Sequence, residues 1–144
     1  MTAEYLVAVH AIVYLNHRGG YLSSEELAAN VCTNPARVRK VLSRLEKAGL
    51  VEVKNGYLGG YHFPCDPKTV TLLDVLDALD ETLVATKWRS GSLDMDCQVA
   101  SGMAGVMDGV IGEVNESGRK TLAGITIQNI NDRLSLKGAE HETI

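Results

Sequence analysis

The 144-residue sequence has little of what marks specialised protein classes: three cysteines, three prolines and 5% aromatic residues. An odd number of scattered cysteines (Cys32, Cys65 and Cys97) gives no disulfide framework, which favours a reducing compartment. The composition also excludes collagen-like and disordered chains. A chain of this length buries enough apolar surface to form a core without disulfides, so we expect one ordinary domain, or a small domain with a helical appendage.

Long apolar runs are absent as well. The longest apolar stretch near the start, residues 5–15, is interrupted by His10 and is shorter than the ~20 residues that cross a bilayer. It lacks a basic leader and a small-residue cleavage site, so we expect neither a signal peptide nor a membrane span. These features predict a cytoplasmic protein with no membrane partner.

The net charge of −4 argues against a nucleic-acid-binding protein, but the charges are distributed unevenly. Residues 37–54 contain six basic and two acidic residues, whereas residues 74–144 contain six basic and twelve acidic residues. The first segment is suited to contact an anion and the second repels one. The alternative is that the basic residues form an ordinary solvated helix face.

Apolar periodicity and capping residues predict three helices followed by a β-hairpin. The first helix is expected over residues 2–17, with Thr2 as its cap and an apolar stripe of Leu6, Val9, Ile12 and Val13. The second is a short segment that begins with the capping-box sequence at 23–26, and the third covers residues 35–48, with Asn34 as its cap and Pro35 at the first helical position. Residues 50–63 contain two short extended runs around a glycine-rich tip. This order of elements is that of a winged helix-turn-helix.

The remaining sequence predicts a helix over residues 72–83 capped by Thr71, a loop over 85–96 and a long helix over 97–122. The predicted fold is therefore mainly α with a small β-hairpin wing. It comprises a winged helix-turn-helix domain at residues 1–83 and a loop followed by a long C-terminal helix at residues 84–144.

The predicted helix at residues 35–48 has one apolar stripe and a basic face that this stripe leaves free. The stripe comprises Val38, Val41, Leu42 and Leu45, and the free face comprises Arg37, Lys40, Arg44 and Lys47, flanked by Arg39 and Ser43. A helix with such a face after a tight turn fits the ~12 Å wide major groove of DNA. The sequence therefore predicts that residues 1–83 bind double-stranded DNA.

The predicted DNA contacts divide into those that read bases and those that bind phosphate. Base edges or adjacent phosphates are assigned to Thr33, Asn34, Arg37 and Lys40, whereas phosphates are assigned to Arg44, Lys47 and Lys54. The helix starts at Ser24 and Pro35 add backbone amide donors, and Arg39 flanks the face. The competing interpretation pairs Arg37 and Arg44 with acidic residues of the same chain.

The predicted hairpin tip contains Gly56, Gly59 and Gly60, which permit tight turns and close backbone approach to DNA. The functional interpretation is a probe of the minor groove or of phosphate that carries Lys54, Asn55 and Tyr57. The alternative is an ordinary hairpin tip, and for Tyr57 this alternative is preferred.

These residues, in this order and spacing, resemble the Rrf2 family of bacterial winged-helix transcription regulators, which includes iron–sulfur-cluster, nitric-oxide and cysteine-metabolism sensors. The resemblance covers about residues 5–80. It rests on Ala8-x-His10-Ala11, Ser23-x-Glu25-Glu26-Leu27-Ala28, Thr33-Asn34-Pro35, the segment 38–51, Gly56-x-x-Gly59-Gly60-Tyr61 and Pro67-x-x-Val70-Thr71-Leu72-Leu73-Asp74-Val75. It implies a homodimer that binds a palindromic operator and usually represses transcription.

Two departures from the family pattern are informative. The family wing often carries Ser-x-Arg-Gly where this chain has Val53-Lys54-Asn55-Gly56, so the wing arginine is missing. Cluster-binding members place three cysteines before the long helix, where this chain has only Cys97. Because an iron–sulfur cluster takes about four protein ligands, we expect no cluster, no other metal and no cofactor.

The long predicted helix carries a narrow apolar seam of the kind found between helices. The seam comprises Val99, Met103, Val106, Val110 and Val114, and Gly102, Gly105, Gly109 and Gly112 run beside it. Each glycine costs about 1 kcal/mol relative to alanine in a helix interior. Close backbone packing against a second subunit or against the first helix is the expected compensation, and a shorter or kinked helix is the alternative. We favour a homodimer interface.

Cys97 is the candidate for signal sensing. It stands at a predicted helix N-terminus, which lowers the pKa of a thiol, next to carboxylates that raise it. A redox-sensing thiol that responds to an oxidant is one hypothesis, and an ordinary helix-start residue is the other. A small-molecule effector is a further possibility, for which the loop around Trp88 and Arg89 is a candidate.

Two other classes of protein compete with a regulator. The sequence has no Ser-His-Asp arrangement with supporting motifs, no paired zinc ligands and no phosphate-binding loop, so we expect no enzyme. The remaining alternative is a protein-interaction module that has the winged-helix fold and no specific DNA binding.

Overall fold

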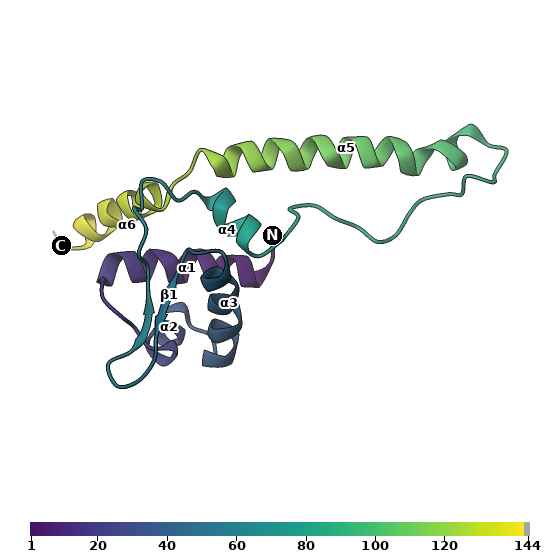
Figure 1. The fold of residues 1–144 in the computed structure, drawn as a ribbon. Coiled ribbons are helices and arrows are strands. Elements are labelled where there is room, and N and C mark those ends of the chain that lie inside the picture. The colour runs from purple at the N-terminus through teal and green to yellow at the C-terminus, as the bar shows by residue number, and fades with distance from the viewer. Residues whose placement is uncertain (143–144) are drawn as a thin grey trace.

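The computed structural model describes the backbone of residues 1–142 and the side chains of residues 1–135. These residues form, in order, α1 (Ala3–Arg18), α2 (Ser24–Val31), α3 (Pro35–Lys47), β1 (Glu52–Lys54), β2 (Gly60–His62), α4 (Leu72–Ala78), α5 (Gln98–Ala123) and α6 (Ile127–Glu142). Helices α1–α4 and the β1–β2 hairpin form a body, and α5 projects from it as an arm (Figure 1). The predicted mainly helical fold with a hairpin wing is confirmed.

The residues that start each helix of the body are those that the sequence predicts. The side chains of Thr2, Ser23, Asn34 and Thr71 each accept a hydrogen bond from a backbone N–H in the first turn of the helix that follows. Ser23 and Thr71 form reciprocal capping boxes with Glu26 and Asp74, and Pro35 occupies the first turn of α3. These caps satisfy donors that have no partner within the helix.

The core of the body lies where α1 packs against α3 and α4. Its fully buried side chains include Tyr5, Ile12 and Leu15 from α1, Val38, Val41, Leu42 and Leu45 from α3, and Val75, Leu76 and Leu79 from the α4 region. The predicted apolar stripe of α3 is therefore confirmed. On α1 the predicted stripe is partly wrong, because Leu6 is 60% exposed and the buried face contains Tyr5 and Ala8 in its place.

Helix α4 ends earlier than the sequence predicts. It stops at Ala78, and Asp80 adopts a left-handed conformation with φ of 52°, which a continuing helix does not allow. From this point the chain leaves the body towards the arm.

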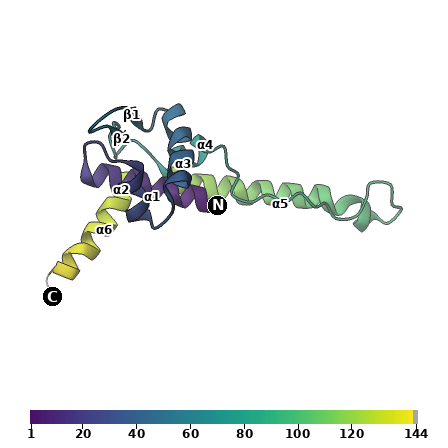
Figure 2. The ribbon, with the colours of Figure 1, turned by 90° about the horizontal axis from the view of Figure 1, so that it is seen from below.

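Helix α6 is not predicted from the sequence, and it returns the chain to the body next to α1 (Figures 1 and 2). Thr126 and Asn129 exchange side-chain and backbone hydrogen bonds at its start, at 2.9 and 3.0 Å. The backbone N–H of Leu72 donates to the carbonyl of Ile125 at 2.9 Å, and Ile127 is fully buried. This Thr-x-x-Asn capping pattern is the sequence signal that could have located the helix.

The loop between α4 and α5, which the sequence predicts, is attached to α5 at three places. One is a backbone bond, in which the N–H of Ser92 donates to the carbonyl of Ala100 at 3.0 Å. The side chain of Asn115 hydrogen-bonds both backbone groups of Val84 at 2.8 Å. Arg89 forms a bidentate ion pair with Asp108, with N–O distances of 2.9 and 2.8 Å, which lowers the pKa of Asp108. The arm, defined as residues 82–123, is therefore a helix with a loop bound alongside it.

The buried hydroxyl of Tyr5 donates to the carbonyl of Leu72 at 2.8 Å and joins α1 to the start of α4. We expect Tyr5→Phe to lower the free energy of unfolding by about 1–3 kcal/mol, because the Leu72 carbonyl loses its donor. Burial and the charge of Glu81 raise the pKa of Tyr5 from 10.0 to about 12. The tyrosine contribution is therefore present below pH 10 and declines as the pH rises towards 12.

Urea titrations on both sides of pH 10 measure this contribution. Tyr5→Phe should remove part of the alkaline loss of stability. The control is Tyr57→Phe, since the side chain of Tyr57 is 94% exposed and its hydroxyl should not affect stability. An unchanged alkaline loss in Tyr5→Phe would contradict the assignment.

Candidate nucleic-acid interface

The turn between α2 and α3 sets the direction of α3. Cys32 ends α2 in a left-handed conformation with φ of 65°, and its backbone N–H donates to the carbonyl of Ala28. The N–H of Thr33 donates to the same carbonyl at 3.0 Å. The next residue, Asn34, is the N-cap of α3, and its side chain accepts a hydrogen bond from the N–H of Arg37 at 2.8 Å. The predicted helix-turn-helix is therefore present, and its turn caps both the end of α2 and the start of α3.

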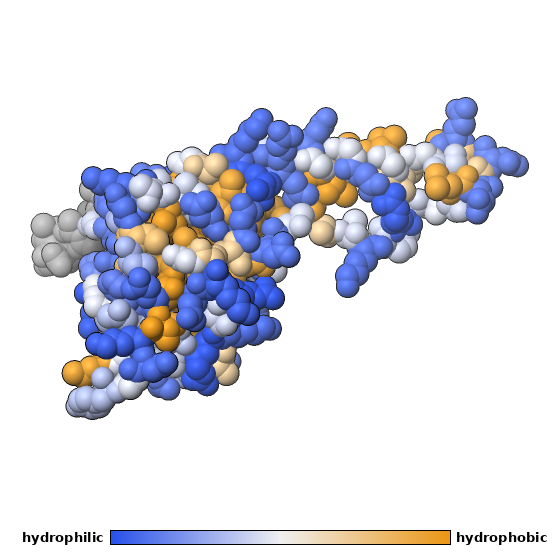
Figure 3. Space-filling view, in the orientation of Figure 1, coloured by the Kyte–Doolittle hydropathy of each residue, from blue (hydrophilic) through white to orange (hydrophobic). Residues whose placement is uncertain are grey.

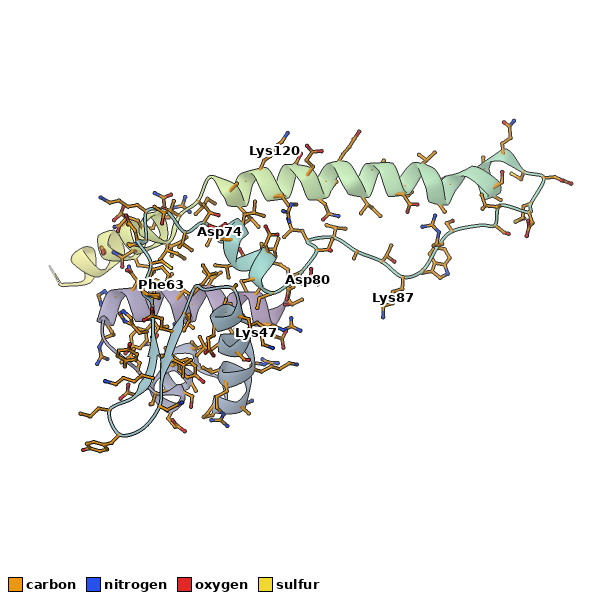
Figure 4. All side chains as sticks on the ribbon, viewed as in Figure 1. Lys47, Phe63, Asp74, Asp80, Lys87 and Lys120 are labelled. Atoms are coloured by element: carbon orange, nitrogen blue, oxygen red, sulfur yellow. The ribbon has the colours of Figure 1, made fainter. Side chains whose placement is uncertain are left out.

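Burial of the apolar stripe leaves the basic side of α3 exposed. The basic residues Arg37, Arg39, Lys40, Arg44 and Lys47 are all exposed. At 3.6 residues per turn, Lys40, Ser43 and Lys47 lie opposite the buried stripe, while Arg37 and Arg44 lie on one margin and Arg39 on the other. Figure 4 labels Lys47 on α3, next to the region where α3 meets α4.

The margins of this face bind groups of the same chain. Arg44 donates to the carbonyl of Leu79 at 3.0 Å, so its guanidinium is directed towards the end of α4. Arg37 is 3.8 Å from Glu4, and Arg39 is 3.9 Å from Glu25. The competing interpretation, that Arg37 and Arg44 pair with acidic residues of the same chain, thus holds for Arg37, whereas Arg44 donates to a backbone carbonyl. Exposed ion pairs contribute only about 0–1 kcal/mol, so DNA phosphates can replace the two carboxylates at low cost.

Several predicted contact residues are already engaged within the protein. The hydroxyl of Ser24 is buried and accepts a hydrogen bond from Arg39 at 3.2 Å. The backbone N–H of Ser24, at the start of α2, is therefore the group that a phosphate can reach. The Asn34 carbonyl oxygen caps α3, which leaves its amide nitrogen as the donor for DNA. Thr33 and Pro35 are half-buried beside them.

The wing is an antiparallel hairpin in which Val53 pairs with Tyr61 and Lys54 with Gly60. Backbone hydrogen bonds of 2.8 and 2.9 Å between Leu22 and Tyr61 attach it to the segment before α2. A Cβ atom at Gly60 would lie 2.4 Å from the carbonyl oxygen of Leu22. The close approach that requires glycine at this position is therefore to the protein's own backbone.

The charged and polar groups of the wing are exposed. The ammonium of Lys54 lies 5.6 Å from the centre of the Tyr21 ring, a cation–π contact that the sequence did not predict because Tyr21 is distant in the chain. Asn55 and Tyr57 are exposed in the loop that follows β1. The hairpin tip extends past α2 and α3 at the lower side of the body in Figure 1.

The apolar seam of α5 is exposed in the isolated chain. Val99, Met103, Val106, Val110 and Val114 are each between 37% and 64% exposed, and Figure 3 shows orange side chains along the arm. Gly102, Gly105, Gly109 and Gly112 have open space beside them, since a Cβ atom there would meet no described atom within 4 Å. The expectation that the first helix covers these glycines is therefore wrong, and so is a shortened helix, because α5 runs unbroken from Gln98 to Ala123.

Cys97 is the N-cap residue of α5, at the end of the helix that lies farthest from the body (Figure 1). Its thiol is exposed, and the backbone N–H groups of Ala100 and Val99 lower its pKa. Trp88 is 77% exposed, and the suggested effector pocket at its loop stays a prediction. A groove of about 810 Å³ lies elsewhere, between α1 and α6, lined by Leu6, His10, Tyr14, Ile130 and Leu134 among others.

An exposed basic helix that follows a tight turn, with a hairpin at its side, defines a winged helix-turn-helix protein of the kind that binds duplex DNA. The family model of the Rrf2 proteins, described as iron-dependent transcriptional regulators, matches residues 1–133. The chain belongs to the Rrf2 family, and it is a DNA-binding transcription regulator and not an enzyme.

Solved structures share this fold. A protein of Lactobacillus plantarum classed as a transcriptional regulator is 26% identical, with a TM-score of 0.82 over 99% of this chain and 98% of that chain. IscR of T. potens is 21% identical, with a TM-score of 0.69 over 100% of this chain and 90% of that chain. CymR (YrzC), the global cysteine regulator of B. subtilis, is 16% identical, with a TM-score of 0.69 over 92% of this chain and 96% of that chain. The search of curated proteins gave no significant match.

The family description raises the question of iron. Among the described side chains, no group of three or more His, Cys, Asp or Glu residues is arranged to hold a metal ion. Cys97 is at the end of the arm, whereas Cys32 ends α2 and Cys65 lies at the edge of the core. An iron–sulfur cluster takes about four protein ligands, so the residues of this chain do not fit one. Within the same described part of the chain, every helix is too short or too polar to span a membrane.

Proposed function

We propose that this protein is a homodimeric, sequence-specific repressor that binds a palindromic operator through α3 and the wing. The observation that carries the proposal is the exposed cationic face of α3, held outward by the burial of Val38, Val41, Leu42 and Leu45. A helix presented in this way enters the major groove with its N-terminal residues nearest the bases. Residues 1–83 then form the DNA-binding domain.

The roles of the side chains follow from their places on this face. Lys40 and Lys47, opposite the buried stripe, face the groove most directly, and Arg37 lies at the N-terminal end where bases are read. Arg39 exchanges its carboxylate partner for phosphate. Arg44 keeps its bond to the end of α4 or exchanges it for phosphate. In the wing, Lys54, Asn55 and Tyr57 contact the adjacent backbone or minor groove.

The arm supplies the dimer contact in this proposal, with residues 84–144 as the dimerisation region. An exposed apolar seam along a helix of 26 residues is a surface that a second copy can cover. The open space beside the four glycines allows the two helix backbones to approach closely. A two-fold pair reads two half-sites about 34 Å apart, which is more specific than one short site.

Two sites are candidates for sensing a signal, Cys97 on the arm and the groove between α1 and α6 on the body. At Cys97 the lowered pKa favours the thiolate. The thiolate attacks one oxygen of hydrogen peroxide, so that the S–O bond forms as the O–O bond breaks, hydroxide leaves and the cysteine becomes a sulfenic acid. The groove between α1 and α6 has a volume typical of sites for small molecules. We assign the oxidant response to Cys97 and regard the groove as the second candidate, for a small-molecule effector.

Arg37→Ala should weaken binding to an operator selected from random DNA by about 1–3 kcal/mol and relax the base preference at one position. Mobility shifts over a salt titration measure both effects, since phosphate contacts make affinity fall steeply with salt. The matched control is Lys87→Ala, which removes an exposed cation from the arm (Figure 4).

Two outcomes would revise this assignment. An equal loss on all sequences would make Arg37 a phosphate contact. A wild-type protein that prefers no duplex over a scrambled one at physiological ionic strength would favour the alternative of a protein-interaction module.

Val106→Asp should convert the dimer into a monomer, because it places a charge in the middle of the seam. Gly105→Ala should weaken the dimer as well, although alanine raises helix propensity by about 1 kcal/mol. Sedimentation velocity measures the oligomeric state. The control is Val53→Asp, which introduces the same charge at an exposed apolar residue of the wing. A dimer that tolerates both arm variants would refute the proposed interface.

Cys97→Ser should abolish any change in DNA affinity caused by peroxide, because the oxidisable sulfur is removed. Cys32→Ser is the control, since Cys32 is also exposed but lies on the body at the end of α2. Operator binding before and after peroxide treatment measures the response. A response that persists in Cys97→Ser and disappears in Cys32→Ser would transfer the sensing role to the body.

A further inference from the structure

The tip of the wing is a four-residue turn with an unusual residue in it. The backbone N–H of Gly59 donates to the carbonyl of Gly56 at 3.0 Å, so Tyr57 and Leu58 occupy the two central positions. Leu58 has a φ of 64°. Turns with a positive φ at the second central residue normally place glycine or asparagine there, because a bulky side chain is unfavourable in this conformation.

The glycine next to Leu58 differs from it, because there the residue type is explained by lack of space. A Cβ atom at Gly59 would lie 2.2 Å from the carbonyl oxygen of Lys54, so glycine is required there for lack of space. Glycine would also relieve the backbone at the preceding position, yet the chain carries Leu58 there. Departures from local conformational preference are concentrated at functional positions, where another requirement outweighs them.

The side chains of the turn are also the most exposed large apolar groups of the wing. Tyr57 is 94% exposed and Leu58 is 77% exposed. The hairpin that carries them is attached to the body by the Leu22–Tyr61 backbone bonds, so the tip is presented on a fixed support. It lies beyond α2 and α3 on the side of the body where the helix-turn-helix is (Figure 1).

We propose that Tyr57 and Leu58 form an apolar wedge that enters the minor groove beside the half-site and partly unstacks one base step. This inference rests on the proposed DNA binding and adds a specificity-determining role for Leu58. Apolar side chains inserted in this way bend DNA towards the major groove. The bend brings the duplex closer to the basic face of α3.

The chemistry of the tip favours reading of DNA shape over reading of base edges. The isobutyl group of Leu58 cannot distinguish bases by hydrogen bonds, and the nearby ammonium of Lys54 lies over the Tyr21 ring. The energy of unstacking depends on the step, and pyrimidine–purine steps such as TA are the most easily deformed. The wedge therefore gives a preference for a flexible step beside each half-site.

The test compares wild type with Leu58→Asn in the full-length chain. Asparagine tolerates the left-handed conformation, so the variant should unfold at the same temperature as wild type or a higher one. It should also lose most of the DNA bend, measured by energy transfer between dyes at the ends of an operator duplex selected from random DNA. Its preference for a TA over a GC step beside the half-site should fall about tenfold. Leu93→Asn is the matched control, since Leu93 is 88% exposed in the arm loop.

The outcomes separate this inference from the proposed function. Wild-type bending and step preference in Leu58→Asn would overturn the wedge while Arg37-dependent binding still stands. A Leu58→Asn variant that bends DNA like wild type but no longer binds a protein from the cell would assign the tip to a protein partner instead. If the wild type selects no duplex at all, the proposed DNA binding fails first.

Discussion

The packing of α3 against α1 is the constraint on which the DNA-binding face depends. Val38, Leu42 and Leu45 are completely buried, and their spacing fixes the rotation of α3 about its axis. Once that rotation is fixed, Lys40 and Lys47 are directed to solvent because they lie on the opposite side of the helix. Loss of this packing would change the orientation of α3 and would also destabilise the fold. The functional face is in this sense a consequence of the core.

The arm is organised differently, because among its described residues only its two ends, at Leu83 and Leu122, pack against the core of the body. Leu122 and Ile127 are buried in the same core as α1, whereas none of the described residues 84–121 belongs to that core. Ion pairs and backbone bonds hold the loop between α4 and α5 to helix α5 and leave the seam and the glycines uncovered. The body therefore satisfies its apolar surface internally, and the arm does not. This asymmetry supports a division of labour between DNA contact and assembly.

The features predicted correctly from sequence are those that short-range interactions determine. The caps at Thr2, Ser23 and Asn34 and the apolar stripe of α3 depend on residues within about one or two turns. The errors involve residues that are distant in the sequence. Leu6 is exposed because the buried side of α1 is the side that packs against α3 and α4, and α6 is not predicted because its start depends on burial of Ile127 in the core. The direction of Arg44 depends on a carbonyl of α4, which helix periodicity does not report. The base contacts themselves remain predictions.

A continuous set of polar contacts leads from the arm to α3. Arg119 of α5 forms a bidentate pair with Asp77 of α4 at 2.8 and 3.3 Å, and the carbonyl of Leu79 at the end of α4 accepts from Arg44 of α3. Guanidinium groups hold both contacts in defined directions, so α4 is joined to α5 on one side and to α3 on the other. Arg119 and Arg44 are therefore the two positions at which coupling between the arm and the DNA-binding face is to be measured, because a physical warrant for coupling is a two-state element that both sites bias.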